Sequence, residues 1–276
     1  MRRLFLTLLF CNLGATVALA AAYDDFNQGL AAIRAGDNGR AIVLLTAAIS
    51  AGDLSAGLMP VAHRNRGLAY LHTGQCQLSL DDFDAALKLK PDDVDSQIYR
   101  AGAHVCAKDL TAALADYSTI LDKSPAADVY GARGLLRWRM RDFAGASEDF
   151  AQETRMMPTN PYAVLWLETA RLRAGQFDSK IAGQDADKVD SRHWPAPLLS
   201  LLAGDKTADD VDREALRPDA RPAEVQICEA DFYMGEWALG RQDLATARAR
   251  LGSAVQRCAQ GQVLRAAALA DWEKLQ

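Results

Sequence analysis

Four cysteines carry the clearest chemical signal in this chain, because they form two couples with the same spacing. Cys76 and Cys106 lie 30 residues apart, and so do Cys228 and Cys258. In an exported protein such thiols form disulfides, and four thiols allow three pairings. Free buried thiols are the alternative. The pairing therefore depends on the elements that bring the cysteines together.

No other set of residues has the spacing of a metal or catalytic site. The four histidines, which do not follow a metal-ligand pattern, are His63, His72, His104 and His193. Two of them, His63 and His104, fall at helix-packing positions, so we interpret them as structural. Neither a phosphate-binding glycine-rich loop nor a GxSxG or HExxH motif occurs. We expect no cofactor, no metal and no catalytic residue; the alternative is an enzyme with an unrecognised site in the irregular segment 183–222.

A repeat of about 34 residues predicts the elements that position these side chains. In its clearest copy, residues 60–93, the positions that define the repeat hold Gly67, Tyr70, Gly74, Phe83, Ala86 and Pro91. Small residues at positions 8 and 20 let two helices approach closely, an aromatic at position 24 fills the gap, and a proline at position 32 ends the second helix. The pattern resembles the tetratricopeptide repeat (TPR), a helix-turn-helix unit that stacks into a superhelix with a protein-binding inner face.

Further copies of the repeat extend along the chain. Clear copies occupy 60–93, 94–126, 127–160 and 228–261, and degenerate copies occupy 22–55, 161–188 and 190–220. The stretch 262–275 has an apolar period of three to four and is predicted to be a capping helix. We therefore predict an all-α fold, a TPR superhelix (α-solenoid) of about six helix-turn-helix units plus a C-terminal capping helix, as a single domain over 21–276.

Opposite charges recur at fixed positions of the three central repeats. Arginine occupies position 7 and aspartate occupies position 23, and these positions face each other in an antiparallel hairpin that turns at positions 15 and 16. Each arginine can therefore meet an aspartate of its own repeat. We predict three structural ion pairs rather than ligand contacts: Arg66–Asp82, Arg100–Asp116 and Arg133–Asp149.

The same geometry selects the disulfide pairing. Cys76 and Cys106 lie symmetrically about Pro91, where two repeats join, and Cys228 and Cys258 lie symmetrically about the turn of the last hairpin. Each couple can therefore meet across antiparallel helices. We predict the disulfides Cys76–Cys106 and Cys228–Cys258, each of which stabilises the fold by about 3 kcal/mol by closing a loop of ~30 residues.

One face of each first helix is predicted to bind a partner. Positions 5, 9 and 12 point to the concave side of a TPR superhelix, and here they are mostly apolar and are rimmed by arginines, which suits an extended or helical protein segment. The candidate groove residues are Arg64, Leu68, Leu71, Ile98, Val105, Leu135, Trp138 and Leu165. Leu135 and Trp138 are the strongest candidates. Coverage by the adjacent repeat is the alternative for each side chain.

The first 20 residues differ in composition from the rest of the chain. Arg2 and Arg3 precede an apolar run and small residues that end at Ala20, a pattern typical of a cleavable secretory signal. A retained membrane anchor is one alternative, although the run is shorter than the ~20 residues that span a bilayer. Lipidation at Cys11 is another, which the bulky Phe10 disfavours. Cleavage would lower the formal net charge from −5 to −7 by removing the two arginines, which disfavours nucleic acid and anionic membrane surfaces as partners.

The C-terminal part resembles one family more specifically. Trp194, the turn at 204–206 and the run Phe232 to Gly235 are similar to the matching parts of NlpI-type periplasmic TPR proteins. The resemblance implies a homodimeric adaptor that brings peptidoglycan hydrolases together with one another or with a processing protease. We therefore expect a noncatalytic periplasmic scaffold that binds protein or peptide segments and has no membrane span in its mature form. A TPR subunit of an outer-membrane assembly or secretion complex is the alternative function.

Overall fold

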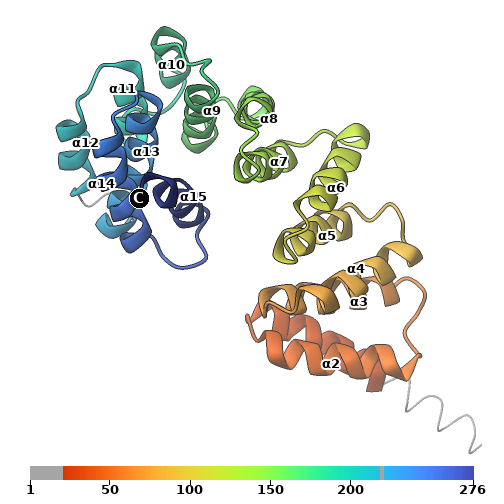
Figure 1. Cartoon of the computed structure of the whole chain (residues 1–276). Coiled ribbons are helices and arrows are strands. Elements are labelled where there is room, and N and C mark those ends of the chain that lie inside the picture. The colour runs from red at the N-terminus through yellow and green to blue at the C-terminus, as the bar shows by residue number, and fades with distance from the viewer. Residues whose placement is uncertain (1–20, 218–220) are drawn as a thin grey trace, which may run out of the picture. The chain divides into compact units, whose positions relative to one another are not determined.

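The computed structural model of the chain describes residues 21–217 and 221–276, so the predicted signal segment and Cys11 lie outside the described residues. The described residues form helices joined by short turns, with no strand among them (Figure 1). This confirms the all-α class. The chain divides into two compact units with the boundary between Ser124 and Pro125, which we call unit 1 and unit 2. The single solenoid over 21–276 stays a prediction.

Unit 1 consists of helical hairpins in chain order. After a helix over residues 21–34 come α2 (Asn38–Ala51), α3 (Met59–His72), α4 (Cys76–Leu89), α5 (Val94–Cys106) and α6 (Leu110–Lys123). The pairs α3 with α4 and α5 with α6 pack as hairpins, and α2 packs on α3 and α4 on α5. These bounds agree with the repeats predicted at 22–55, 60–93 and 94–126.

Local sequence explains where these helices begin and turn. Asp37, Asp93 and Asp109 each precede a helix, and their side chains accept hydrogen bonds from backbone N–H groups of the first turn. The turn inside a hairpin uses a left-handed residue, which is Gly74 between α3 and α4, with φ 75°. Lys108 takes the same place between α5 and α6 with φ 65°, so the turn geometry does not require glycine in every repeat.

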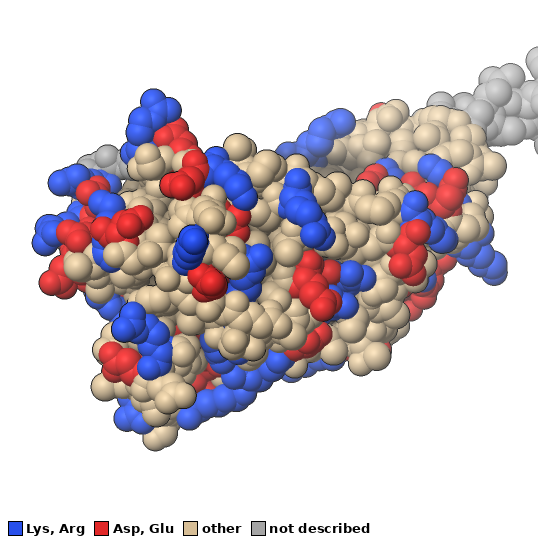
Figure 2. All heavy atoms as spheres, turned by 90° about the horizontal axis from the view of Figure 1, so that it is seen from above, with Lys and Arg blue, Asp and Glu red and all other residues tan. Residues whose placement is uncertain are grey.

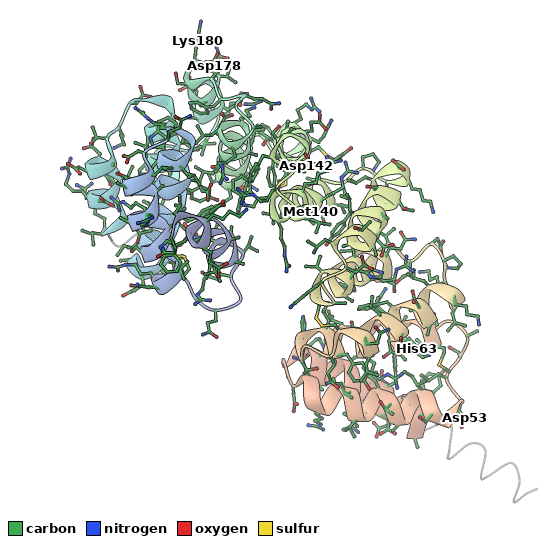
Figure 3. All side chains as sticks on the ribbon, viewed as in Figure 1. Asp53, His63, Met140, Asp142, Asp178 and Lys180 are labelled. Carbon is green, nitrogen blue, oxygen red and sulfur yellow. A yellow bond between two sulfur atoms is a disulfide. The ribbon has the colours of Figure 1, made fainter. Side chains whose placement is uncertain are left out.

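Unit 2 begins with a regular hairpin and continues less regularly. Its helices are α7 (Ala127–Arg139), α8 (Phe143–Met156), α9 (Pro161–Arg173), α10 (Ser179–Ala186), α11 (Ala196–Ala203), α12 (Ala208–Ala215), α13 (Ala223–Gly240), α14 (Leu244–Arg257) and α15 (Val263–Trp272). Met140 and Asp142, labelled in Figure 3, lie at the turn between α7 and α8. The helices α10, α11 and α12 have eight residues each, which is where the repeats were predicted to be degenerate.

The core of unit 2 lies around α9, which several later helices contact. Both α11 and α13 pack on α9, and α15 packs on α13 and α14. At the end of α13, Gly240 lies so close to α9 that a Cβ atom built on it would be 2.3 Å from Leu172 Cγ. One apolar cluster therefore joins the α7–α8 hairpin, α9 and the C-terminal helices.

All three predicted ion pairs are confirmed. The shortest nitrogen–oxygen distance is 2.7 Å in each pair, Arg66–Asp82, Arg100–Asp116 and Arg133–Asp149. Burial opposes ionisation of Asp82, but hydrogen bonds from Arg66 and His63 outweigh it, so the pKa of this carboxyl lies below its usual value. The pairs therefore fasten the two helices of each central hairpin.

Two disulfides are present, with the pairing that the spacing predicted. Cys76 is bonded to Cys106, which ties the start of α4 to the end of α5, and Cys228 is bonded to Cys258, which ties α13 to the end of α14. Each closes a loop with a sequence separation of 30. Both therefore link elements within a single unit.

Candidate partner-binding surfaces

In unit 1 the predicted groove residues are all half-buried and differ in what they contact. Arg64 of α3 forms ion pairs with Asp93 and Asp95, at 2.9 and 3.3 Å, so it holds the start of α5 rather than standing free. Leu68 and Leu71 pack partly against the cluster around Phe83. Leu80 and Phe83 of their own repeat and Ala103 of α5 form that cluster, and both leucines are half-buried.

Ile98 and Val105 remain half-buried on α5. They are seven residues apart, so they lie two helical turns apart on the same face. Gly102 lies between them on that face, and it is also half-buried. These residues form the part of the predicted stripe that α5 presents, and we call Ile98, Gly102 and Val105 the α5 stripe.

In unit 2 the structure corrects two predicted contact residues. Trp138 is 4% exposed and Leu165 is 0% exposed, so neither offers side-chain area to a partner. The ring of Trp138 packs edge-on against Phe143 and Trp166, with centroid distances of 4.9 and 5.3 Å. Leu165 lies on α9, whose face α11 and α13 cover. The expected open face is closed here by the C-terminal helices of the same unit.

Leu135 is half-buried and lines a cavity of about 350 Å³ that lies entirely within unit 2. Four segments supply its walls: α7, α9, the residues around the start of α13, and the residues around the start of α15. The lining residues are Leu135, Tyr162, Trp166, Arg221, Val225, Cys228, Glu229, Tyr233, Gln262, Val263 and Leu264. The walls are mostly apolar and aromatic, and the polar groups come from few side chains.

The carboxylate of Glu229, 5% exposed, is the centre of these polar groups. Its Oε2 accepts hydrogen bonds from Tyr162 Oη at 2.9 Å and from Trp194 Nε1 at 2.6 Å, and its Oε1 accepts one from Arg221 Nη1 at 2.9 Å. Arg221 also lies over the ring of Tyr162, 4.8 Å from its centroid. Burial and the neighbouring carboxylate raise the pKa of Tyr162, so this phenol stays a neutral donor.

Tyr233 is the unsatisfied group of the cavity. Its side chain is 3% exposed, and its hydroxyl oxygen is buried without a hydrogen-bond partner among the described residues. Burial raises its pKa well above the usual value, so the hydroxyl keeps its proton.

The sequence did not indicate this cavity. Glu229 and Arg221 belong to no motif, and Tyr233 lies only in the run that resembles NlpI-type proteins. The cavity forms because α13 begins at Ala223, five residues before the repeat predicted at 228–261, and because α9 and α13 pack together. The packing of α9 on α13 is a contact between segments that are far apart in the chain.

Among the described residues there is no group of three or more His, Cys, Asp or Glu side chains that could hold a metal ion. His63 Nδ1 lies 2.8 Å from Asp82 Oδ1, which agrees with a structural role for this histidine.

No helix of the described ranges is both long and apolar enough to span a bilayer. On the face drawn in Figure 2, basic and acidic side chains are interspersed.

Comparison with known proteins identifies the repeat. Residues 26–94 and 64–128 match the family model of the tetratricopeptide repeat. A tetratricopeptide repeat protein from Parabacteroides merdae has a similar structure, with a TM-score of 0.62 and 18% sequence identity over 91% of this chain and 99% of that chain. The match in sequence covers the first repeats, and the match in structure covers both units.

Two other solved structures show the same fold. The C-terminal part of a TPR repeat-containing protein from Cytophaga hutchinsonii matches with a TM-score of 0.55 and 13% identity, covering 95% of this chain and 98% of that one. The structure of pilF from Pseudomonas aeruginosa matches with a TM-score of 0.51 and 17% identity, covering 94% and 99%. At these identities the likeness shows a shared helical-repeat fold. The resemblance to NlpI-type proteins stays a prediction.

Proposed function

We propose that this chain, a TPR solenoid by fold, is a noncatalytic scaffold of the periplasm that binds segments of other proteins. Stacked TPR units present the side chains of their first helices to a partner. The observation that carries the proposal is the α5 stripe, because Ile98 and Val105 hold apolar surface at partner-binding positions and are only half-buried. Ion pairs hold the hairpins that present them, so the surface is preformed.

The two disulfides support the proposed compartment. Disulfides persist in oxidising environments such as the bacterial periplasm and are rare in the cytosol. The first 20 residues have the composition of a secretory signal. Fractionation of cells that express the full chain, followed by mass spectrometry, should find a periplasmic protein that begins near residue 21. An uncleaved cytosolic chain would contradict this location.

The proposed partners are cell-wall hydrolases or a processing protease, and the proposed assembly is a homodimer. Both rest on the resemblance of residues 190–258 to NlpI-type adaptors. Affinity capture from envelope extracts tests the partner class, because recovery of outer-membrane assembly or secretion factors in place of hydrolases and proteases would favour the alternative function. Release of muropeptides from peptidoglycan by the pure protein alone would contradict a noncatalytic role.

Substitutions in the α5 stripe test the binding surface. We expect Ile98→Arg and Val105→Arg each to reduce capture of the recovered partner at least 10-fold, because a charge replaces apolar contact area, while helicity by circular dichroism stays near wild type. Val43→Arg is the matched control, since Val43 is 68% exposed on α2, outside the stripe. Equal capture by all three variants would exclude the α5 stripe as the binding site.

A further inference from the structure

We propose that the Cys76–Cys106 disulfide is a thiol–disulfide exchange site for a protein dithiol, and that its reduction weakens partner capture by the α5 stripe. The inference rests on the proposed function, which it deepens by naming how that surface is regulated. The disulfide Cys228–Cys258 provides an internal comparison, because it has the same spacing in the sequence and a different setting in the fold.

The two disulfides differ in how easily a reductant can reach them. Both cysteines of Cys228–Cys258 lie in the apolar cluster of unit 2, where they are 2% and 4% exposed. Both cysteines of Cys76–Cys106 are half-buried, and the neighbouring turns, residues 73–75 and 107–109, are exposed. Exchange begins when a thiolate attacks a disulfide sulfur, so it requires access to that sulfur. The disulfide of unit 1 is therefore the one that another protein can attack.

The place of Cys76 in its helix favours cleavage of this bond. Cys76 is the first residue of α4, where the partial positive charge of the helix N-terminus stabilises a thiolate. Cys106 is the last residue of α5 and has no such position. In the other disulfide, Cys228 lies inside α13 and Cys258 follows the end of α14. Because the better-stabilised thiolate leaves faster, we expect the reductant to attack Cys106 and to release Cys76.

Reduction transfers two electrons in two exchange steps. A thiolate of the reductant attacks Cys106 Sγ, the Cys76–Cys106 bond breaks, and Cys76 leaves as a thiolate that takes up a proton. The second thiolate of the reductant then attacks the reductant's own sulfur in the mixed disulfide, and Cys106 leaves and takes up a proton. The reductant ends as a disulfide, and its two thiols have supplied the two protons. The reverse sequence, with an oxidised dithiol, closes the bond again.

The disulfide lies where α5 has few other polar contacts with α4. Nearer the start of α5, Arg100 pairs with Asp84 of α4 at 2.9 Å, and the ring centroid of Tyr99 lies 5.9 Å from that of Phe83. Among the described residues, no side-chain hydrogen bond or ion pair joins α4 to residues 101–106. Apart from the apolar cluster around Phe83, the disulfide is what fixes the end of α5 on α4.

This end of α5 carries part of the proposed binding surface. Val105, the last residue of the α5 stripe, directly precedes Cys106. Leu71 of α3 lies beside the stripe, since a Cβ atom built on Gly102 would be 3.6 Å from Leu71 Cδ2. Because α3 and α4 form one hairpin, the disulfide limits how far α5 can move from α3. Reduction would let the two hairpins separate at this end, so that Leu71 and Val105 no longer form one surface.

Reduction of the folded protein tests the exchange site. The oxidised full mature chain is incubated with reduced thioredoxin, a protein dithiol, and the reaction is quenched with acid at intervals. Free thiols are then alkylated in denaturant and assigned by peptide mass spectrometry. We expect Cys76 and Cys106 to appear as thiols at least 100-fold faster than Cys228 and Cys258. Equal rates for the two disulfides would overturn the exchange site.

A thioredoxin variant without its second cysteine tests the direction of attack, because it cannot complete the second step. It should be trapped as a mixed disulfide on Cys106. Trapping on Cys76 would overturn the proposed role of the α4 N-terminus.

Partner capture tests the regulation, with the protein recovered from envelope extracts as the probe. Thioredoxin-reduced wild type should capture it on the order of 10-fold less than oxidised wild type, and reoxidation should restore capture. In hydrogen exchange, residues 101–107 should lose protection on reduction while residues 94–100 keep it. Unchanged capture and unchanged protection would overturn the regulation.

A variant that combines Cys76→Ser with Cys106→Ser is the matched control for the reductant. It should capture as weakly as reduced wild type, and treatment with thioredoxin should not change it. Loss of capture by this variant only after treatment would mean that the reductant acts elsewhere, which would overturn the regulation. If the variant fails to fold, the comparison of oxidised with reduced wild type still decides.

Failure of this inference differs from failure of the proposed function. If Ile98→Arg abolishes capture and reduction leaves capture unchanged, the regulation falls and the scaffold function stands. If both stripe variants capture normally, the α5 stripe is excluded as the binding site, and its regulation falls with it.

Discussion

At the scale of single residues, burial moves the pKa of Glu168 towards neutral pH. Its side chain on α9 is 0% exposed, and Oε2 has no hydrogen-bond partner among the described residues. Burial raises its pKa to about 7, although the ion pair with Arg171 works in the opposite direction. Between these two pKa values, the folded protein therefore keeps a proton on Glu168, whereas the unfolded chain, in which the pKa is 4.5, has released it.

This difference predicts how stability depends on pH. The folded state binds more protons than the unfolded state between about pH 4.5 and 7, so the contribution is complete below 4.5 and is lost as pH rises through 7. We expect Glu168→Gln to reduce this loss, by an amount on the order of 2–3 kcal/mol between pH 5 and 8. Urea unfolding at several pH values measures it. Glu148→Gln, an exposed change on α8, is the control. Parallel curves for Glu168→Gln and wild type would contradict the prediction.

The pairing of residues could be predicted from the sequence where the repeat defines which positions face each other. The pairs Arg66–Asp82 and Arg100–Asp116 and both disulfides follow from positions that face each other in a hairpin, so sequence spacing was sufficient. Glu229 and Tyr233 have no such frame. Glu229 accepts hydrogen bonds from Tyr162 of α9 and from Trp194 in the segment before α11, and no periodicity connects those segments.

At the scale of elements, the close approach of the two helices in each hairpin explains the small residues of the repeat. A Cβ atom built on Gly134 of α7 would be 2.7 Å from Phe150 Cε1 of α8, so the aromatic ring needs the space that glycine leaves. Gly102 of α5 lies in a looser place, where a Cβ would be 3.6 Å from Leu71 Cδ2. The same substitution should therefore have opposite effects at these two positions.

We expect Gly134→Ala to lower the free energy of unfolding by about 1–3 kcal/mol, because Phe150 must shift in a packed core. Gly102→Ala should raise it by about 0.5–1 kcal/mol, because alanine favours the helix and meets only ordinary contacts. Chemical denaturation of both variants gives the comparison. A destabilised Gly102→Ala would mean that the α5 stripe is packed more tightly than its half-exposure indicates.

The helices were predictable where the repeat is regular and less so where it is worn. The sequence placed the hairpins of α3–α4, α5–α6 and α7–α8 correctly, and it placed a terminal helix at 262–275 where α15 lies. Residues 179–215 follow the repeat only weakly, because α10, α11 and α12 have eight residues each. The five-residue extension of α13 before Cys228, which helps to build the cavity, follows Pro222 and lies outside the repeat.

At the scale of the whole molecule, a set of charges joins parts of unit 2 that are far apart in the chain. Arg173 of α9 pairs with Glu236 of α13 and, at 3.1 Å, with Asp271 of α15. Arg141, at the α7–α8 turn, reaches the same Asp271 at 2.6 Å across 130 residues of sequence. Arg173 also lies over the rings of Trp138 and Phe143. These ion pairs hold α13 and α15 against α9 and the α7–α8 turn, which helps to cover the inner face that was predicted to be open.

Removal of Asp271, which is 3% exposed, should loosen the contacts of α15 with α9 and the α7–α8 turn. In Asp271→Ala, Arg173 would keep only Glu236 and Arg141 would lose its partner, so we expect a loss of about 3 kcal/mol or more in the free energy of unfolding of unit 2. Hydrogen exchange should accelerate in α15 and at the α7–α8 turn and stay unchanged in α2 to α6. Asp122→Ala, an exposed change on α6, should alter neither. Unchanged protection of α15 in Asp271→Ala would mean that apolar packing of this helix on α13 and α14 is sufficient to hold it.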